Sequence, residues 1–376
     1  MHILADENIT LASHYFGTYG RLTLCPGRRI DRAMLRDVDV LLVRSVTRVD
    51  ADLLAESPCR FVATATSGID HIDTDYLQQH GIGLGWARGC NAEGVVDYVF
   101  SALATLALER DLDWRRCGIG IVGCGEIGGR LAQRLLALGI APRIHDPLLE
   151  EAHPLTSHFA PLEEVLQQPV VSLHVPLTDS GAAPTRRLIE RGALARLGPH
   201  GVLINASRGE VVDEAALLQH CRRHADFCAI LDAWQGEPAI DVAMLQQAMI
   251  GTAHIAGYSN GGKLRGTLMI HDAFCHHFGF DPAAIAPAGA LEVQTLCYQG
   301  GNTLQGLSQL VLQAYDLRGD DVRLRAAVGV GSEAGGFDRL RRDYALRREF
   351  GEFAVWGLGE DPALRAAVAG LGMRPA

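Results

Sequence analysis

Short apolar runs recur along most of the chain and alternate with longer segments in which apolar residues follow the helical period. The short runs favour strands, and the segments between them, such as 127–138 and 213–222, favour helices. The predicted strands are residues 2–5, 40–43, 61–66, 82–85, 118–123, 142–146, 170–176, 201–207, 227–233 and 250–257. This alternation predicts an α/β fold with parallel sheets and right-handed crossovers.

Two segments depart from this alternation. Residues 91–110 predict one long helix with few polar positions, which Asn91 can cap, and we expect it to pack between two bodies at a domain boundary. From about residue 286 the pattern predicts an antiparallel strand in "LEVQTLCYQG", helices at 303–317 and 337–349, a strand at 353–358 and a last helix. The tail is therefore expected to form a small α+β domain.

Composition narrows the class of protein. The 376 residues are 48% hydrophobic and 21% charged, as in globular domains with full cores. The net charge of -10 argues against binding nucleic acid, and it implies that an anionic substrate would need a locally basic pocket.

The cysteines and the first residues of the chain indicate the cellular compartment of the protein. The nine cysteines include no C-x-x-C pair, which argues against a disulfide framework or a zinc site and leads us to expect no metal. "MHILADEN" lacks the features of a secretory signal, and the apolar run 98–108 is too short to span a bilayer. We expect a cytoplasmic protein that does not associate with membranes.

A glycine-rich turn predicts a dinucleotide site. "GIGIVGCGEIGGRLAQRLL" contains G-x-G-x-x-G at Gly123, Gly125 and Gly128, with an apolar strand before it and an amphipathic helix after it. The next predicted strand ends in Asp146, whose carboxylate can accept hydrogen bonds from ribose hydroxyls and would repel a ribose 2′-phosphate. The pattern favours NAD over NADP, and the alternative is a tight turn that binds no ligand.

Three polar residues follow successive predicted strands. Arg208 lies in "NASRGEVVDE", Glu237 in "LDAWQGEP" and His254 in "GTAHIAGYS". An arginine can hold a carboxylate, and a glutamate beside a histidine favours the imidazolium. The three residues therefore suit the oxidation of a 2-hydroxy acid, in which the histidine takes the hydroxyl proton. Taken singly, the three can also be a surface charge, a turn residue and a core histidine.

These segments, together with "GCGEIG" and "HVPLT", resemble the signatures of the D-isomer-specific 2-hydroxyacid dehydrogenases. Within that family, "DEN" at 6–8, "LLVRSVTRV" at 41–49, "GCNAEGVVDYVFSAL" at 89–103, "HIAGYSNGGKLRGT" at 254–267 and the tail resemble the members that oxidise 4-phospho-D-erythronate in vitamin B6 biosynthesis. The resemblance covers essentially the whole chain.

The resemblance implies a Rossmann-type NAD domain at 93–256 and a discontinuous, flavodoxin-like substrate domain at 1–92 and 257–285. A C-terminal dimerisation domain at 286–376 would make the protein a homodimer. The active site would lie in a cleft between the first two domains.

The resemblance also assigns site residues. Arg208, Glu237 and His254 would be catalytic, with His254 carrying the proton. The residues expected at NAD are Gly123, Gly125, Glu126, Ile127, Gly128, Asp146, Val175, Ala206, Ser207, Arg208, Asp232 and Gly257. The residues expected at the substrate are Arg44, Ser45, Thr66, Ser67, Gly68 and Tyr258.

Two positions depart from the family pattern. Val175 replaces the threonine of the usual "HTPL", so only a backbone or packing contact remains there. Ile69 stands where a threonine is expected, although the Ser67 and Gly68 amides can still bind a substrate carboxylate.

A phosphorylated substrate also needs a cation for its phosphate. Arg44 is the first candidate, and the basic run 339–350 is a second, which in a twofold dimer could reach the partner's cleft. The expected reaction is NAD-dependent oxidation of 4-phospho-D-erythronate to (R)-3-hydroxy-2-oxo-4-phosphooxybutanoate. The alternatives are another D-2-hydroxyacid dehydrogenase, of the glycerate or phosphoglycerate type, and a non-catalytic NAD-sensing scaffold.

Overall fold

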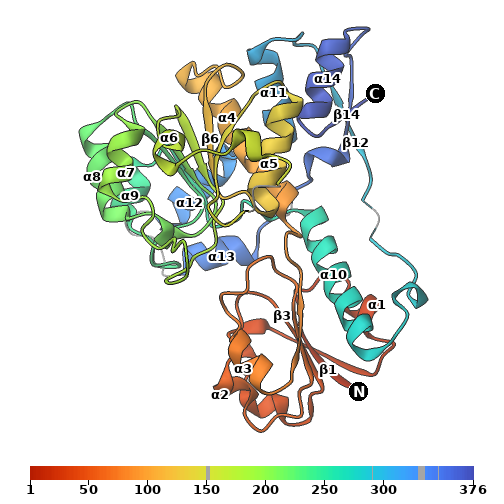
Figure 1. The fold of residues 1–376 in the computed structure, drawn as a ribbon. Helices are drawn as coiled ribbons and strands as arrows, with labels where there is room; N and C mark the ends of the chain where they lie inside the picture. The colour runs from red at the N-terminus through yellow and green to blue at the C-terminus, as the bar shows by residue number, and fades with distance from the viewer. Residues whose placement is uncertain (150–152, 290, 329–334, 346) are drawn as a thin grey trace. The chain divides into compact units, whose positions relative to one another are not determined.

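A computed structural model describes residues 1–149, 153–289, 291–328, 335–345 and 347–376 (Figure 1). The chain divides into two compact units, the first made of 1–91 and 259–292, the second of 92–258 and 293–376. The three-domain boundaries expected from the sequence stay a prediction.

The first unit is built on a parallel sheet. Its described residues form five strands in the order β2-β1-β3-β4-β5. The strands are β1 (His2–Asp6), β2 (Arg21–Cys25), β3 (Val40–Val43), β4 (Phe61–Thr64) and β5 (Gly83–Trp86). β2 was not among the predicted strands, because this edge strand is largely exposed and its residues alternate between polar and apolar.

Helices cover both faces of this sheet (Figure 1). They are α1 (Ala12–Phe16), α2 (Ala51–Leu54), α3 (Thr74–Gln79) and α10 (Asn260–Phe278). Ile270 and Phe274 of α10 pack with Ile3 and Leu42 on one face, while Leu41 packs with α2 and α3 on the other. Alternate strand residues thus enter two different cores, which explains the continuous apolar runs.

The second unit contains a larger parallel sheet. In the described part of the chain its strand order is β11-β10-β9-β8-β6-β7. The strands are β6 (Ile119–Val122), β7 (Arg143–His145), β8 (Val170–Leu173), β9 (Val202–Asn205), β10 (Cys228–Leu231) and β11 (Ile250–Gly251). The accompanying helices are α4 (Ala92–Arg110), α5 (Glu126–Ala137), α6 (Leu162–Val165), α7 (Arg191–Leu197), α8 (Glu214–Arg223) and α9 (Val242–Gln247). The order reverses between β6 and β8, as in doubly wound dinucleotide-binding folds.

The long helix predicted at 91–110 is α4, and it is buried from Gly94 to Ala107. It packs with the sheet and with α11 (Leu304–Ala314) of the C-terminal segment. The predicted cap was wrong: Asn91 Oδ1 is buried and accepts no hydrogen bond in the described structure. None of the described helices is both long enough and apolar enough to cross a membrane.

The C-terminal segment has its own small sheet. Its described strands are β12 (Gln294–Cys297), β13 (Phe353–Trp356) and β14 (Arg374–Pro375). Its helices are α11 (Leu304–Ala314), α12 (Arg318–Val328), α13 (Gly336–Arg342) and α14 (Pro362–Gly370). The helix predicted at 337–349 ends at Arg342, and Leu346 within it lies outside the described residues.

The antiparallel pairing predicted for this segment was wrong. β12 pairs in parallel with β13, and β13 in parallel with β14. The chain crosses between β12 and β13 through α11, α12 and α13, and between β13 and β14 through α14. Long helical connections of this kind join parallel strands, whereas a short turn would be needed for an antiparallel pair.

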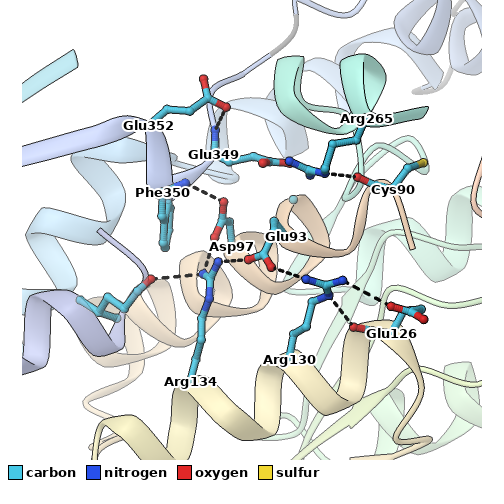
Figure 2. Close-up of polar contacts among 12 residues, drawn as sticks. Cys90, Glu93, Asp97, Glu126, Arg130, Arg134, Arg265, Glu349, Phe350 and Glu352 are labelled. Atoms are coloured by element: carbon cyan, nitrogen blue, oxygen red, sulfur yellow. Dashed lines mark hydrogen bonds and ion pairs between the residues drawn. The ribbon is translucent and has the colours of Figure 1, made fainter. Parts of the chain in front are cut away.

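A buried ionic cluster joins the C-terminal segment to α4 and α5 (Figure 2). Arg134 donates to Asp97 Oδ1 at 2.6 Å and to the Leu371 carbonyl at 3.2 Å, and it also pairs with Glu93. Asp97 Oδ2 accepts the Phe350 amide at 2.8 Å. Burial raises the pKa of Asp97 to about 6 although the Arg134 charge lowers it. The cluster therefore depends on every member being paired.

Candidate active site

The three predicted catalytic residues follow three neighbouring strands of the second unit. Arg208 comes after β9, Glu237 after β10 and His254 after β11, and the three strands lie side by side in parallel. The carboxyl ends of parallel strands share one edge of the sheet, which is where ligands bind in open α/β folds. The topology thus brings residues 208, 237 and 254 to one edge.

His254 and Glu237 form a hydrogen-bonded pair. The His254 Nδ1 lies 2.8 Å from Glu237 Oε2 and 3.1 Å from Oε1. The Glu237 Oε1 also accepts the Trp234 amide at 2.9 Å. Because Nδ1 faces the carboxylate, Nε2 is the ring nitrogen available for exchanging a proton with a substrate.

The electrostatics keep Glu237 ionised. Burial acts to raise the pKa of this carboxyl, but the charge of His254 and its hydrogen bond lower the pKa below its usual range. The His254 side chain is 30% exposed and Glu237 19%, so the pair is accessible yet partly shielded from water. An ionised carboxylate in this position holds the Nδ1–H tautomer and stabilises an imidazolium.

The backbone of His254 is held in an unusual conformation. Its φ is +54°, in the left-handed region that residues other than glycine rarely adopt. Asp232 fixes the loop: Oδ1 accepts Ile255 N at 2.7 Å and Thr252 Oγ1 at 2.6 Å, and Oδ2 accepts Ala256 N at 2.9 Å. Asp232 was predicted to lie at NAD, and here both of its oxygens support the histidine loop.

The Arg208 loop packs tightly against the Glu237 loop. A Cβ on Gly209 would lie 1.9 Å from the Trp234 carbonyl carbon, so only glycine fits after Arg208. Asn205 donates to the Arg208 carbonyl at 3.0 Å, and Ser207 donates to Asn205 Oδ1 at 2.8 Å. These contacts fix the backbone on both sides of Arg208.

The glycine turn connects β6 to α5. Gly123 has a φ of +91°, and a Cβ there would lie 2.6 Å from the His174 carbonyl oxygen and 2.8 Å from Val175 Cγ1. A Cβ on Gly128 would lie 1.9 Å from the Gly123 oxygen, so this glycine lets the helix approach the turn. A Cβ on Gly125 would meet open space, so no described protein atom demands glycine there.

Asp146 connects the turn to the end of β7. Its Oδ2 accepts the Cys124 amide at 2.8 Å, and its Oδ1 accepts the Leu148 amide at 3.1 Å. Each oxygen keeps a further lone pair for a ribose hydroxyl. The open space at Gly125, the α5 N-terminus and this carboxylate fit NAD.

The other predicted NAD residues lie near the same sheet edge or the turn. Glu126 is exposed and pairs with Arg130 at 3.3 Å, while Ile127 is half-buried. Ala206 and Ser207 are buried, and Gly257 is half-buried.

The predicted substrate residues other than Tyr258 belong to the first unit. They follow β3 and β4: Arg44, Ser45, Thr66, Ser67 and Gly68. Arg44 Nε donates to the buried Asp6 at 3.2 Å, so one carboxylate already faces this cation. Ser67 Oγ accepts the Gly89 amide at 3.1 Å.

A pocket of about 410 Å³ opens beside Ser45. It is lined by Ser45, Val46, Arg48, Val49, Asp50, Asp70, His71, Ile72 and Asp73. Three carboxylates in this lining make the pocket a poor place for an anion.

Two cations that were not assigned individually from the sequence lie beside predicted residues. Lys263 is in the first turn of α10, where burial and the charge of Arg44 lower its pKa while Asp6 raises it. Arg341 of α13 lies over the Tyr258 ring, with its Cζ 6.0 Å from the ring centroid. The available signals were "GGK" at a helix start and the basic run 339–350, which the sequence analysis directed toward a partner subunit.

Two family models match the chain. Residues 108–256 match the NAD binding domain of the D-isomer specific 2-hydroxyacid dehydrogenases, and this range contains all three predicted catalytic residues. Residues 290–372 match a domain of unknown function.

Similar proteins extend over the full length. The chain is 46% identical over 382 residues to the erythronate-4-phosphate dehydrogenase of Stutzerimonas stutzeri, covering 100% of this chain and 99% of the relative. It is 44% identical to that of Azotobacter vinelandii, covering 100% of both. The D-lactate dehydrogenase of Aquifex aeolicus, solved with NAD and lactic acid, shares the fold with a TM-score of 0.63 at 22% identity, over 77% of this chain and 100% of that one. This chain therefore belongs to the D-isomer-specific 2-hydroxyacid dehydrogenase family, in the branch of the erythronate-4-phosphate dehydrogenases.

Proposed function

We propose that this chain catalyses the NAD-dependent oxidation of 4-phospho-D-erythronate to (R)-3-hydroxy-2-oxo-4-phosphooxybutanoate, a step of pyridoxal 5′-phosphate biosynthesis. The observation that carries the proposal is the His254–Glu237 pair, 2.8 Å apart, on the same sheet as the dinucleotide turn. The names of the full-length relatives support the choice of substrate.

The chemistry requires removing a hydride from C2 and a proton from the hydroxyl group on that carbon. NAD, held at the Gly123–Gly128 turn and Asp146, would supply the hydride acceptor for C2. His254 Nε2 takes the proton of the C2 hydroxyl, and the C2–O bond becomes a carbonyl. Glu237 stabilises the imidazolium that forms, and Arg208 orients the substrate carboxylate and polarises the developing carbonyl.

Recognition of the substrate is assigned to the residues that follow β3 and β4 and to Tyr258. The Ser67 and Gly68 amides serve the carboxylate, and Ser45, Thr66 and Tyr258 contact the remaining groups. Arg44 serves the phosphate with help from Lys263, because the two cations lie close enough for the charge of Arg44 to lower the pKa of Lys263.

We also propose that two copies associate through the C-terminal segment. Trp356 on β13 is 56% exposed and Val293 next to β12 is 43% exposed, and β12 forms an edge of its sheet. Exposed apolar side chains on this sheet, together with its open β12 edge, fit a partner surface. A single-chain mass in solution by light scattering would contradict this assembly.

The activity is tested by following NADH formation with 4-phospho-D-erythronate, D-erythronate, D-glycerate and 3-phospho-D-glycerate. We expect the highest kcat/KM with the first substrate. His254→Ala should lower kcat by about 10²- to 10⁴-fold, because a general base contributes on that order. Its circular dichroism spectrum should match that of the wild type.

Other outcomes would select the rival functions. Preferred turnover of D-glycerate or 3-phospho-D-glycerate would move the chain to another D-2-hydroxyacid dehydrogenase activity. Binding of NAD without turnover of any substrate in the panel would indicate a cofactor-sensing scaffold.

A further inference from the structure

Arg341 lies within the second unit beside two predicted site residues. It belongs to α13 of the C-terminal segment, in the range that matches a domain of unknown function. Its Cζ is 6.0 Å from the ring centroid of Tyr258 and 6.0 Å from that of Phe337. Tyr344 packs edge-on against the same Tyr258 ring, with centroids 5.9 Å apart. The C-terminal segment thus contacts the end of the His254 loop in the same chain.

The electrostatic surroundings of Arg341 are incompletely balanced. Burial lowers the pKa of its guanidinium, but the Tyr258 phenol and the Glu237 carboxylate outweigh this and raise the pKa. Glu237, however, is already engaged by His254 and by the Trp234 amide. The Arg341 Nε is buried and has no hydrogen-bond partner among the described residues.

The other arginines of the segment lie in different surroundings. Arg347 also keeps buried donors without a partner among the described residues, but it lies over the Tyr315 ring and donates to the Gly94 carbonyl at 2.8 Å. Arg342, one residue further on, is exposed and pairs with Asp343 at 2.8 Å. Arg325 pairs with Asp321 at 2.8 Å and donates to two backbone carbonyls. Arg341 differs from them because it is directed to a tyrosine of the site and keeps a buried donor unused.

We propose that Arg341 is a substrate-binding residue, supplied by the C-terminal segment of the same chain, that contacts the phosphate of the phosphorylated hydroxy acid. A planar guanidinium with a spare donor suits a phosphate, which accepts several charge-assisted hydrogen bonds. The inference rests on the proposed function for the identity of the substrate. It gives the segment a role in specificity and needs no residue from a second subunit.

The test compares matched ligands that differ only in the phosphate. Binding of 4-phospho-D-erythronate and of D-erythronate to the NADH-loaded full-length enzyme is measured by calorimetry, and KM is measured for both with NAD. Arg341→Ala should weaken binding of the phosphorylated ligand by about 10- to 100-fold, as for loss of a charged hydrogen bond. Binding of D-erythronate should change less than about threefold. Arg341→Lys should restore part of the loss, and Arg342→Ala should match the wild type.

A second variant separates contact with phosphate from positioning of the tyrosine. Tyr258→Phe removes the hydroxyl through which Arg341 would otherwise act. The Arg341→Ala loss for the phosphorylated ligand should persist in the Tyr258→Phe background. Its disappearance there, or an equal loss for both ligands, would overturn the phosphate contact.

The proposed function and the role of Arg341 can fail separately. Calorimetry reports the phosphate contact even if the wild type turns over neither ligand, an outcome that would refute only the proposed reaction. Equal affinity of the wild type for the two ligands would refute the role of Arg341.

Discussion

Two buried arginines connect the C-terminal segment to the rest of the second unit, and they differ in how fully the protein satisfies them. Arg134 donates to Asp97, to Glu93 and to the Leu371 carbonyl, and Asp97 in turn accepts the Phe350 amide (Figure 2). Arg341 has the Tyr258 ring beside it, and its Nε has no partner in the described residues.

The difference separates a structural cluster from a binding site. Buried polar groups in proteins are nearly always paired, because an unpaired donor loses its hydration without compensation. The Arg134 cluster meets this requirement within the chain and stabilises the fold. Arg341 leaves its Nε unpaired beside Tyr258, a predicted substrate residue, and we propose that an anionic ligand supplies the partner.

The largest expected effect comes from breaking the satisfied cluster. Asp97→Ala leaves Arg134 and the Phe350 amide without their buried acceptor, and we expect the free energy of unfolding to fall by about 3–5 kcal/mol. Urea denaturation measures this change. The kcat of the folded fraction should remain that of the wild type, because Asp97 holds α5 and the C-terminal segment and not the catalytic pair.

Asp343→Ala is the matched control, since it removes an exposed ion pair with Arg342. Its midpoint of unfolding should not move measurably. An Asp97→Ala enzyme as stable as the wild type would show that the cluster contributes nothing beyond its own desolvation cost.

Most of the fold was predictable because parallel strands buried on both faces are continuous apolar runs. The β9 strand shows this, with Leu203 in one core and Ile204 in the other. The β2 strand was missed because an exposed edge strand leaves no such run. The small sheet was assigned the wrong direction because local pattern does not reveal which strand a segment pairs with.

The meeting of His254 and Glu237 was predictable because each residue follows one of two neighbouring parallel strands, and their side chains lie 2.8 Å apart. Their catalytic roles stay a prediction. Arg341 could not be assigned in this way, since its place beside Tyr258 depends on how a distant helix packs. Similarly, the sequence did not show that Asp232 holds the histidine loop, because backbone amides carry no sequence signal.

A smaller effect on stability than that of Asp97→Ala is expected at Glu214, a buried carboxyl that the protein satisfies only in part. It accepts the Gln235 amide, yet burial and the charges of Asp241, Glu237 and Glu210 raise its pKa to about 7. A raised carboxyl pKa contributes stability below about pH 4.5 that is lost as the pH rises through about 7. Glu214→Gln should therefore leave stability unchanged near about pH 5 and increase it by up to about 3 kcal/mol near about pH 8. Thermal unfolding at the two pH values measures this, and an equal shift at both would contradict the assignment to ionisation.

The smallest effect is expected for the stability of Arg341→Ala without ligand, which is compared directly with that of Asp97→Ala. Removing Asp97 strands a buried charge, whereas removing Arg341 deletes a guanidinium that no described carboxylate holds in an ion pair. We expect the free energy of unfolding to change by less than about 1 kcal/mol. The variant loses the contacts of Arg341 with Tyr258 and Phe337, but it also no longer buries an unpaired donor, and the two effects offset each other. Urea denaturation of the apoenzyme measures this beside Asp97→Ala. A loss of unfolding free energy as large as that of Asp97→Ala would show that Arg341 stabilises the fold as Arg134 does. The distinction between the two arginines would then fail.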